Sequence, residues 1–502
     1  MNRIFLIFVI VVLSVTSLKG QATGTKYVLT FKEVVELAKQ QSPQAIEARH
    51  SFRASYFRFM NYKANFLPKL TLATNPAAWK QSIQTVPVID DDKVNYKEAK
   101  ANTLTSTVGL ELRQNIGFTG GNISLGSDFS RIQNFLQDNS DFATQFTTTP
   151  IELRLEQPLN GYNRFRWLKK IEPLEYEAAK QNYIVQMEYV AGRAIDNFFL
   201  LAISQVNLNM LQTNLKNTEE LYNVMKGRYN LGTVTEDDML RVELRHMEAS
   251  SDLNSALIGI ESAQNRLRSF LGFRDNVEIE LLIDHEIPSF KVSPEKALDL
   301  ALTRNPDIIS QNLKILAAEE DVAYYRSQKG ITLTMNASFG LDNTGYTFDD
   351  GYSSPFNNRQ NISAGIRVPI LDWSQAKNRY RQAQSSLEVV EAQMQQQETD
   401  FKQNVFLQVM GFNMQEEQLR IAAKSDTIAS KSYNIMYQRY LTGKGTVTDL
   451  NLADTAKDNA KIGYMRALNT YWNLFYTVRR LTLFDFLNNQ PLEEDFNLIV
   501  GE

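Results

Sequence analysis

The side chains of this sequence that could do chemistry are acidic residues at two matching positions. Asp238 and Asp449 each follow an Arg-Tyr pair, which begins ten residues earlier at Arg228 and at Arg439. Carboxylates that several chains bring together in a narrow pore create a negative potential, which favours cations and can hold a divalent ion. The alternative is structural, since aspartate near a helix N-terminus satisfies free N–H groups. The sequence leaves both roles open.

Other kinds of reactive site are not predicted. The three histidines lie far apart, and no carboxylates stand near them at ligand spacing. The sequence has no Gly-rich phosphate loop and no nucleophile elbow. It has no cysteine, which excludes disulfides, and its formal net charge of −4 does not suggest a nucleic-acid partner. We therefore expect no enzyme activity, no metal site and no cofactor.

Residues 1–20 predict a secretory signal peptide. Arg3 precedes an almost wholly apolar run from Ile4 to Val15, and small residues follow before Gln21. The alternative is a membrane anchor, but the run is shorter than the roughly 20 residues that a spanning helix needs. No later segment reads as a spanning helix, so a membrane location would require a closed β-barrel in an outer membrane.

The rest of the chain is an internal duplication with two constant offsets. The pairs Leu37-Ala38 and Leu70-Thr71 recur 263 residues later as Leu300-Ala301 and Leu333-Thr334. Pro158 recurs 211 residues later as Pro369, as does the Arg-Tyr pair. The difference between the offsets (263 − 211) places 52 extra residues among the strands of the first half. We expect a first repeat at 21–290, a second at 291–486 and a C-terminal tail at 487–502.

Each half predicts strands followed by two long helices. Strands are expected at about 68–158 and 331–370, because apolar and polar residues alternate there with a period of two. One apolar and one polar face suits a barrel wall, although a soluble sandwich has the same alternation. The extra residues predict a β-hairpin that turns at Gly117 to Gly121, and the sequence does not decide whether it joins the other strands.

The helices are expected at 161–271 and 372–483, with breaks at Gly232 and Gly443. The first helix of each half is roughly 100 Å long at 1.5 Å per residue. A heptad seam runs along the second-half helix through Ala376, Tyr380, Ala383, Leu387, Val390, Met394, Phe401, Val405, Phe412 and Leu419. The strands also carry or adjoin aromatic residues that fit either an interfacial girdle or loop packing, namely Trp79, Tyr346, Phe348, Tyr352 and Phe356.

With the export signal and the duplicated Arg-Tyr-x-x-Gly-x-x-x-x-x-Asp turns, the chain resembles the TolC-like outer-membrane efflux protein family from about Leu29 to Phe486. The resemblance implies an α+β membrane protein and a homotrimer. Three chains would share one β-barrel among outer-membrane lipids, continued by a coiled-coil α-helical barrel in the periplasm. It also implies an exit duct for efflux or type I secretion, fed by a periplasmic adaptor and an inner-membrane transporter of RND or ABC type.

The same resemblance implies roles at the helix turns. Asp449 and Asp238 match the constriction aspartates, and Tyr440 matches the tyrosine that helps to lock the closed tip. The next constriction position holds Leu452, so Asp454 is the candidate for a second pore carboxylate. The remaining residues assigned to locking or to the turns are Tyr229, Arg439, Arg228, Gly443 and Gly232.

The arginine that the family places two residues after the glycine is Gly445 in this sequence, so the closing network is expected to differ. The alternative to a duct is a periplasmic structural coiled-coil protein whose strands form a soluble cap.

Overall fold

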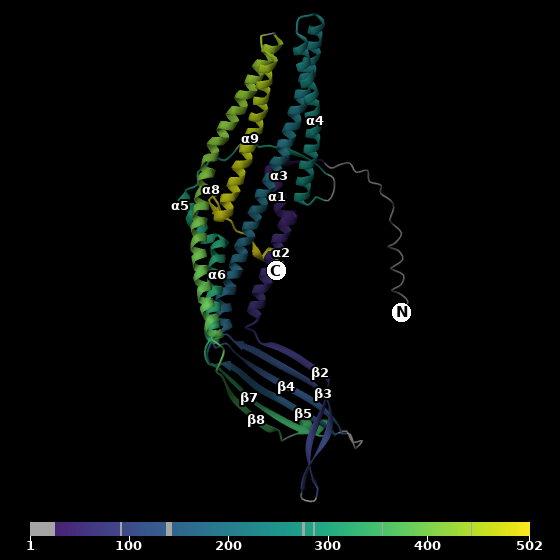
Figure 1. Ribbon diagram of the computed structural model, residues 1–502, viewed down its shortest axis with the longest axis vertical. Helices are drawn as coiled ribbons and strands as arrows, with labels where there is room; N and C mark the ends of the chain where they lie inside the picture. The colour runs from purple at the N-terminus through teal and green to yellow at the C-terminus, as the bar shows by residue number, and fades with distance from the viewer. Residues whose placement is uncertain are drawn as a thin grey trace, which may run out of the picture. The chain divides into compact units, whose positions relative to one another are not determined.

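The computed structural model describes residues 26–90, 93–136, 143–273, 277–284, 287–353, 355–442 and 444–501. The chain folds into two compact units (Figure 1). The helical unit holds the described residues up to Ala48 together with Val185–Ala297 and Val405–Leu492. The sheet unit holds Arg49–Ile184, Leu298–Asn404 and the described residues from Glu493. None of the described helices combines the length and the apolar character needed to cross a membrane.

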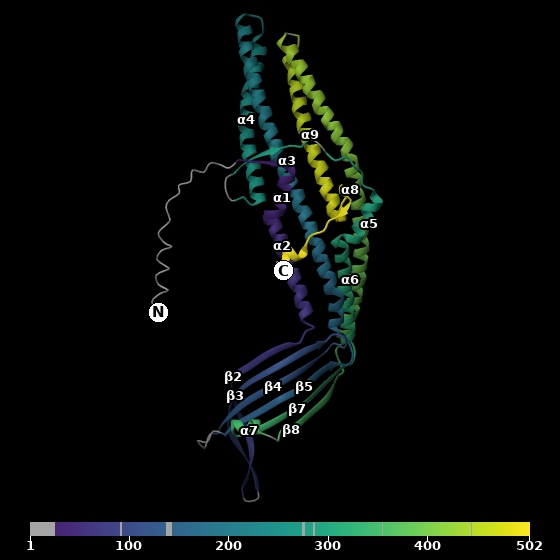
Figure 2. The same ribbon diagram turned by 180° about the vertical axis from the view of Figure 1, so that it is seen from behind.

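The sheet unit contains one antiparallel sheet with the strand order β2-β3-β4-β5-β7-β8 (Figure 2). The strands are β2 (Lys69–Asp90), β3 (Lys93–Ile116), β4 (Gly121–Leu136), β5 (Ala143–Pro158), β7 (Thr332–Gly345) and β8 (Asn357–Arg367). The offsets make β2 equivalent to β7, and β5 to β8. The extra residues of the first half therefore form the β3–β4 hairpin. This hairpin pairs with β2 on one side and with β5 on the other, so it belongs to the sheet.

The alternation of side chains gives this sheet two different faces. On one face, cross-strand pairing aligns an apolar row of exposed residues, which consists of Leu70, Leu112, Leu125, Leu153 and Phe339. The other face is polar, and there Arg154 forms ion pairs with Glu152 at 2.5 Å and with Asp128 at 3.1 Å. Because successive side chains of a strand point to opposite faces, the period of two in the sequence separates the two kinds of residue.

Several helices of the sheet unit are held by aromatic contacts. Helix α7 (Phe348–Tyr352) packs on the sheet, with the rings of Phe348 and Tyr352 at 5.5 and 6.0 Å from that of Phe129. These two aromatic residues contact the sheet and yet remain about half exposed, and Trp79 and Tyr346 are exposed as well, so the structure of one chain leaves both loop packing and an interfacial girdle open. In α2 (Pro43–Ala64), the buried ring of Phe52 lies 5.0 Å from Phe496 of α10 (Phe496–Val500).

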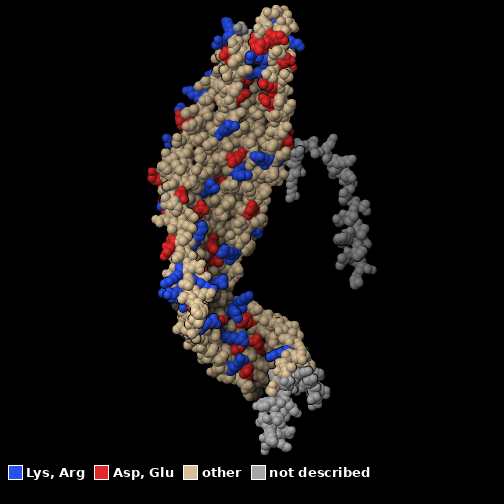
Figure 3. Space-filling view, in the orientation of Figure 1, with Lys and Arg blue, Asp and Glu red and all other residues tan. Residues whose placement is uncertain are grey.

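Two more helices of the sheet unit are α5 (Pro294–Arg304), which begins in the helical unit, and α6 (Pro306–Gln328). Two long helices, α3 (Arg164–Asn230) and α8 (Gln375–Leu441), start in the sheet unit and continue through the helical unit. Near their starts, Lys and Arg side chains gather beside the sheet (Figure 3).

In the helical unit each long helix ends at a turn, and a second helix follows. Helix α3 is followed by α4 (Glu236–Leu271), and α8 is followed by α9 (Val447–Thr482). The two members of each pair lie side by side (Figures 1 and 2). Helices α3 and α8 each have 67 residues, and α4 and α9 each have 36. The two hairpins therefore have the same length on both sides of the turn.

The predicted heptad seam of α8 is buried in the helical unit. Val405 is fully buried, Phe412 is 2% exposed and Leu419 is 4% exposed. Apolar residues repeated every seven positions form a continuous stripe, which packs against neighbouring helices. A smaller sheet of β1 (Lys26–Thr30) and β6 (Glu278–Leu282), helix α1 (Phe31–Gln41) and the short pair β9 (Phe484–Asp485) and β10 (Gln490–Pro491) complete this unit.

A buried ion cluster joins several elements of the helical unit. Glu188 of α3 accepts from Lys39 of α1 at 2.7 Å and from Arg479 of α9 at 2.8 Å. Arg479 also binds Asp485 at 2.5 Å. Burial by itself raises the pKa of Glu188, but the two cations outweigh it and hold the pKa below the ordinary value. The cluster therefore stays charged and holds α1, α3 and α9 together.

Candidate functional site at the helix turns

The two helix turns of the helical unit have matching backbone hydrogen bonds. Helix α3 ends before Gly232, which has a φ of +72°, and the N–H of Thr233 donates to the carbonyl of Arg228 at 3.0 Å. In the second turn, the N–H of Lys444 donates to the carbonyl of Arg439 at 2.9 Å. A left-handed glycine with such a closing bond is a common helix C-cap. Gly443 lies outside the described residues.

Asp449 and Asp238 both occupy the third position of a helix, where they take part in capping. In α9, the hydroxyl of Thr446 donates to Asp449 Oδ2 at 2.7 Å, and the N–H of Asp449 donates to that hydroxyl at 3.1 Å. Thr235 and Asp238 make the same two bonds in α4, at 2.7 and 3.2 Å. The structural role left open by the sequence is therefore present at both sites. Asp449 is also exposed to solvent, so its capping does not exclude a role in a pore.

Asp454 lies in a different environment. It is 7% exposed, and its carboxylate binds Arg245 of α4 at 2.6 Å and Lys457 of α9 at 2.8 Å. Five residues along a helix correspond to about 140° of rotation, so Asp454 cannot point in the direction of Asp449. A carboxylate that is buried and paired with two cations is poorly suited to a pore. The placement of Asp454 argues against the pore role predicted for it.

The polar network around Asp454 extends to α3. The ammonium of Lys457 lies 4.0 Å from the ring centroid of Tyr433, and Asn214 of α3 donates to Asp458 at 3.0 Å. Burial lowers the pKa of Lys457, but the hydrogen bond to Asp454 together with the negative charges of Asp454 and Asp458 outweighs this effect, and the net shift of the pKa is upward. These contacts connect the two hairpins of one chain through polar and charged side chains.

The two tyrosines of the turns differ in burial. Tyr440 is 7% exposed and packs in a cluster with Leu221, Met225, Val242 and Leu450. Its hydroxyl has no hydrogen-bond partner among the described residues, and burial raises its pKa. Tyr229, its counterpart in the first turn, is 38% exposed.

The two arginines also make different contacts. The guanidinium of Arg228 donates to the carbonyl of Leu441 at 3.3 Å, and it thereby joins the end of α3 to the end of α8. Arg439 donates to the carbonyl of Lys444 at 3.4 Å within its own turn. The turn residues are therefore close together in space, but only the first-half arginine connects one hairpin to the other.

Helix α8 carries a second apolar stripe that was not among the residues predicted from the sequence. It consists of residues spaced by seven that are at least half exposed in the single chain, namely Leu407, Met414, Ile421, Ile428 and Ile435. Helix α4 also carries exposed apolar residues, which include Leu240, Leu244, Met247 and Ile258. The constant spacing of seven is the sequence signal that identifies this stripe.

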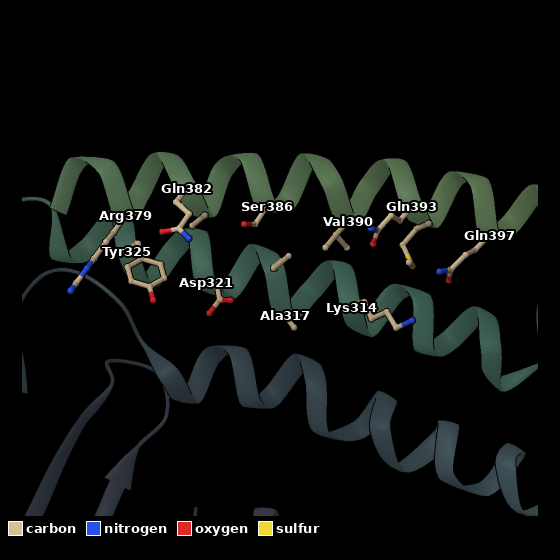
Figure 4. Close-up of a pocket in the computed structure, with 13 residues that line it drawn as sticks. Lys314, Ala317, Asp321, Tyr325, Arg379, Gln382, Ser386, Val390, Gln393 and Gln397 are labelled. Atoms are coloured by element: carbon tan, nitrogen blue, oxygen red, sulfur yellow. The ribbon is translucent and has the colours of Figure 1, made fainter. Parts of the chain in front are cut away.

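A groove of about 580 Å³ lies between α6 and α8 in the sheet unit (Figure 4). Alanines such as Ala317 and Ala383 leave space there, and amide side chains line the α8 side. The charged residues Lys314, Asp321 and Arg379 are spread along the groove and do not point to a common centre. This arrangement offers a helix-packing surface and no grouping of residues for a chemical step.

The chain is similar to known proteins both in its sequence profile and in its fold. Residues 297–482 match the sequence profile described as outer membrane efflux protein. No curated protein sequence matches the chain. The outer-membrane channel CmeC of Campylobacter jejuni has a TM-score of 0.63 at 15% identity, and the alignment covers 93% of this chain and 88% of that one.

Two further solved structures are similar over most of their lengths. The outer-membrane protein VceC of Vibrio cholerae has a TM-score of 0.62 at 15% identity, with 92% of this chain and 97% of that chain covered. The open-state channel MtrE of Neisseria gonorrhoeae has a TM-score of 0.58 at 15% identity, with 90% and 88% covered. At these identities the matches establish a shared fold, and the profile match confirms the predicted family for the second half.

Proposed function

Because residues 297–482 belong to the outer membrane efflux protein family, we propose that the chain is the outer-membrane exit duct of a tripartite efflux or type I secretion system. It passes substrates outward passively and carries out no reaction of its own. The observation that carries the proposal is the channel fold, which extends over 93% of the chain. The protein lies in the outer membrane and extends into the periplasm.

The sheet supports a membrane wall formed by several copies. Its apolar row ends at Leu70 of the edge strand β2, and Ile362 and Ile366 on the other edge strand, β8, are each 67% exposed. Edge strands offer unpaired N–H and C=O groups, which a neighbouring edge can satisfy. In a homotrimer, β8 of one copy meets β2 of the next. Three six-stranded sheets then close a ring of eighteen strands, a number at which barrels enclose an aqueous channel.

The helices support the same assembly. The second stripe of α8, which Ile428 represents at 57% exposure, is left largely uncovered by the described residues of the chain. Contiguous exposed apolar surface marks an interaction site, and a spacing of seven fits another helix. In the homotrimer this stripe packs against the exposed apolar residues of α4 in the neighbouring copy.

The ends of the hairpins form the periplasmic entrance in this proposal. Asp449 projects a carboxylate into the entrance, and Tyr440 and Arg228 hold the closed arrangement. A periplasmic adaptor opens it and connects it to an inner-membrane transporter of RND or ABC type. The alternative remains a periplasmic structural protein, because a coiled coil of this length also suits a spacer.

Cell fractionation and planar bilayers test the proposed function. The purified chain should come from the outer-membrane fraction, run as a trimer that dissociates on heating, and form ion-conducting channels. Recovery in the soluble periplasmic fraction without channel activity would support the structural alternative.

The assembly can be tested separately with a charge placed on the stripe. Ile428→Glu should convert the trimer into monomers in light scattering, because a carboxylate is costly in an apolar helix interface. Leu498→Glu is the matched control, since Leu498 is 76% exposed in the short helix α10 and lies off the stripe. A trimer that survives Ile428→Glu would show that the stripe has another role.

A further inference from the structure

The first two turns of α3 carry an unusual charge pattern. Arg164, Arg166, Lys169 and Lys170 lie there, and the first turn has no acidic residue. The helix macrodipole favours acidic side chains at an N-terminus, so cations at this place oppose it. The first turn of α8 likewise has no acidic residue, and it contains Lys377, which two arginines follow within four residues. Cations that are unfavourable for the helix itself indicate an anion outside the chain.

A pocket of about 590 Å³ lies beside the start of α3 within the sheet unit. Four aromatic rings and two of these cations line it, namely Tyr62, Phe66, Phe118, Phe165, Arg166 and Lys169. Its walls are held in place by specific contacts. The side-chain amide of Asn163 donates to the carbonyls of Gly117 and Phe118 at 3.2 and 3.1 Å, and the ring of Phe66 meets that of Phe165 edge-on at 5.8 Å.

The cations of the pocket are available to a ligand. Among the described residues, neither Arg166 nor Lys169 forms an ion pair, and both are exposed. By contrast, Arg58 on the neighbouring helix α2 is paired with Glu175 and lies 3.6 Å from Glu172. The two cations of the pocket therefore lack the direct acidic partner that Arg58 has among the described residues.

The apolar wall of the pocket is also exposed. Phe118 is 95% exposed at the turn of the β3–β4 hairpin, and Leu112, six residues before it on β3, belongs to the apolar row of the sheet. Aromatic rings that combine with cations at the end of an apolar band are typical of the membrane–water interface. A fully hydrated anion would gain nothing from this aromatic wall.

We propose that the pocket binds an anionic phospholipid of the inner leaflet of the outer membrane. Arg166 and Lys169 bind the phosphate of the headgroup, and the first carbons of an acyl chain pack on Phe118 and Phe165. The inference rests on the proposed function, since it requires the sheet to lie in that membrane. It adds a ligand site that only the first repeat possesses.

The duplication provides a matched control for this site. The residues 211 positions after Phe165, Arg166 and Lys169 are Ala376, Lys377 and Tyr380, so α8 keeps one cation but lacks a counterpart of the Phe165 ring. Phe118 belongs to the inserted hairpin, which has no counterpart in the second repeat. Variants at the start of α8 therefore show what positive charge alone contributes to binding. Variants of the pocket show what the cations and the aromatic rings contribute together.

The test is native mass spectrometry of the full chain in detergent micelles, with dioleoyl-phosphatidylglycerol as the probe. Arg166→Gln combined with Lys169→Gln should weaken binding roughly 10- to 30-fold, since each cation near an anionic lipid surface contributes about one decade or less. Phe118→Ser should weaken it several-fold. The control Lys377→Gln combined with Arg381→Gln should change it less than about twofold on the same reasoning, because neither residue lines the pocket.

Three outcomes would overturn the proposal. One is equal loss of lipid binding in the control and in the pocket variants. Another is equal affinity for phosphatidylcholine, which carries no net charge. A third is displacement of the lipid by millimolar sodium phosphate, which would identify a free-anion site. Channel conductance of the same variants is recorded in bilayers, so that failure of the duct function is seen separately from failure of lipid binding in micelles.

Discussion

The two helix turns have matching backbone hydrogen bonds, but their side chains lie in different surroundings. The hairpin arms have equal lengths, and the closing hydrogen bonds of the turns match. Yet Tyr440 is buried at 7% exposure whereas Tyr229 is 38% exposed, and Asp449 is exposed whereas Asp238 is half-buried. Backbone geometry was therefore kept after the duplication, while the roles of the side chains diverged.

The contact between Arg245 and Asp454 shows the same divergence. The positions related to them by 211 residues hold Ala456 and Glu243, so the first repeat and the second cannot form the same ion pair with exchanged roles. In the proposed trimer the hairpins alternate in a ring and must reach the same depth, which requires equal lengths. They have different neighbours, however, which permits different side chains. We infer that the equal lengths of the hairpins reflect the proposed assembly, whereas the side chains reflect the contacts of each hairpin.

The largest expected difference between the turns concerns the two tyrosines. Tyr440→Ala removes a buried ring and should destabilise the second turn by about 3 kcal/mol, whereas Tyr229→Ala should cost less than about 1 kcal/mol. Hydrogen exchange of the peptides around each turn measures both effects. Equal loss of protection in the two variants would contradict the difference in burial.

The next largest effect is expected at the ion pair between the hairpins. Asp454→Ala leaves Arg245 and Lys457 without their partner and should cost about 2 to 3 kcal/mol, a value at the low end for buried pairs because both cations are partly solvated. Glu243→Ala, at the equivalent position of the first repeat, should change the unfolding free energy by about 0.5 kcal/mol or less. Thermal unfolding compares the two. A similar cost for both variants would mean that the ion pair adds little.

Much of this fold could be predicted because its signals are local and repeated. Alternation with a period of two placed the strands, and the seven-residue spacing from Val405 to Leu419 placed the buried seam of α8. The membership of the β3–β4 hairpin in the sheet could not be predicted. Strand pairing depends on contacts between residues far apart in the sequence, and the alternation is the same inside and outside the sheet.

The site was predicted less well than the fold. Capping by Asp449 and Asp238 followed from their place at a helix start. The environment of Asp454 did not, because its partner Arg245 is 209 residues away in the sequence and no local pattern announces the pair. The exposed stripe on α8 was predictable in principle, since its spacing is regular. Its exposure in the single chain, however, is known only from the structure.

A smaller effect is expected at alkaline pH. Burial raises the pKa of Tyr440, so the folded chain holds the phenol proton more tightly than the unfolded chain does. This contribution to stability is fully present below about pH 10, the ordinary tyrosine pKa, and is lost as the pH rises through the raised value. Tyr440→Phe should therefore lose less stability than the wild type above pH 10 in thermal unfolding. Parallel losses in both proteins would show that Tyr440 does not titrate with folding.

The smallest change in stability is expected at the two capping aspartates. Their substitution is nevertheless the most informative about function. Asp449→Ala and Asp238→Ala each remove a helix cap and should cost about 1 kcal/mol, so stability does not distinguish them. Conduction should distinguish them, because Asp449 is more exposed than Asp238 and its carboxylate can add more negative potential to a pore. In planar bilayers, Asp449→Ala should raise the single-channel conductance and weaken the block by divalent cations more than Asp238→Ala does. Unchanged conductance and block in Asp449→Ala would leave capping as the role of both residues, and the two turns would then differ only in how their tyrosines pack.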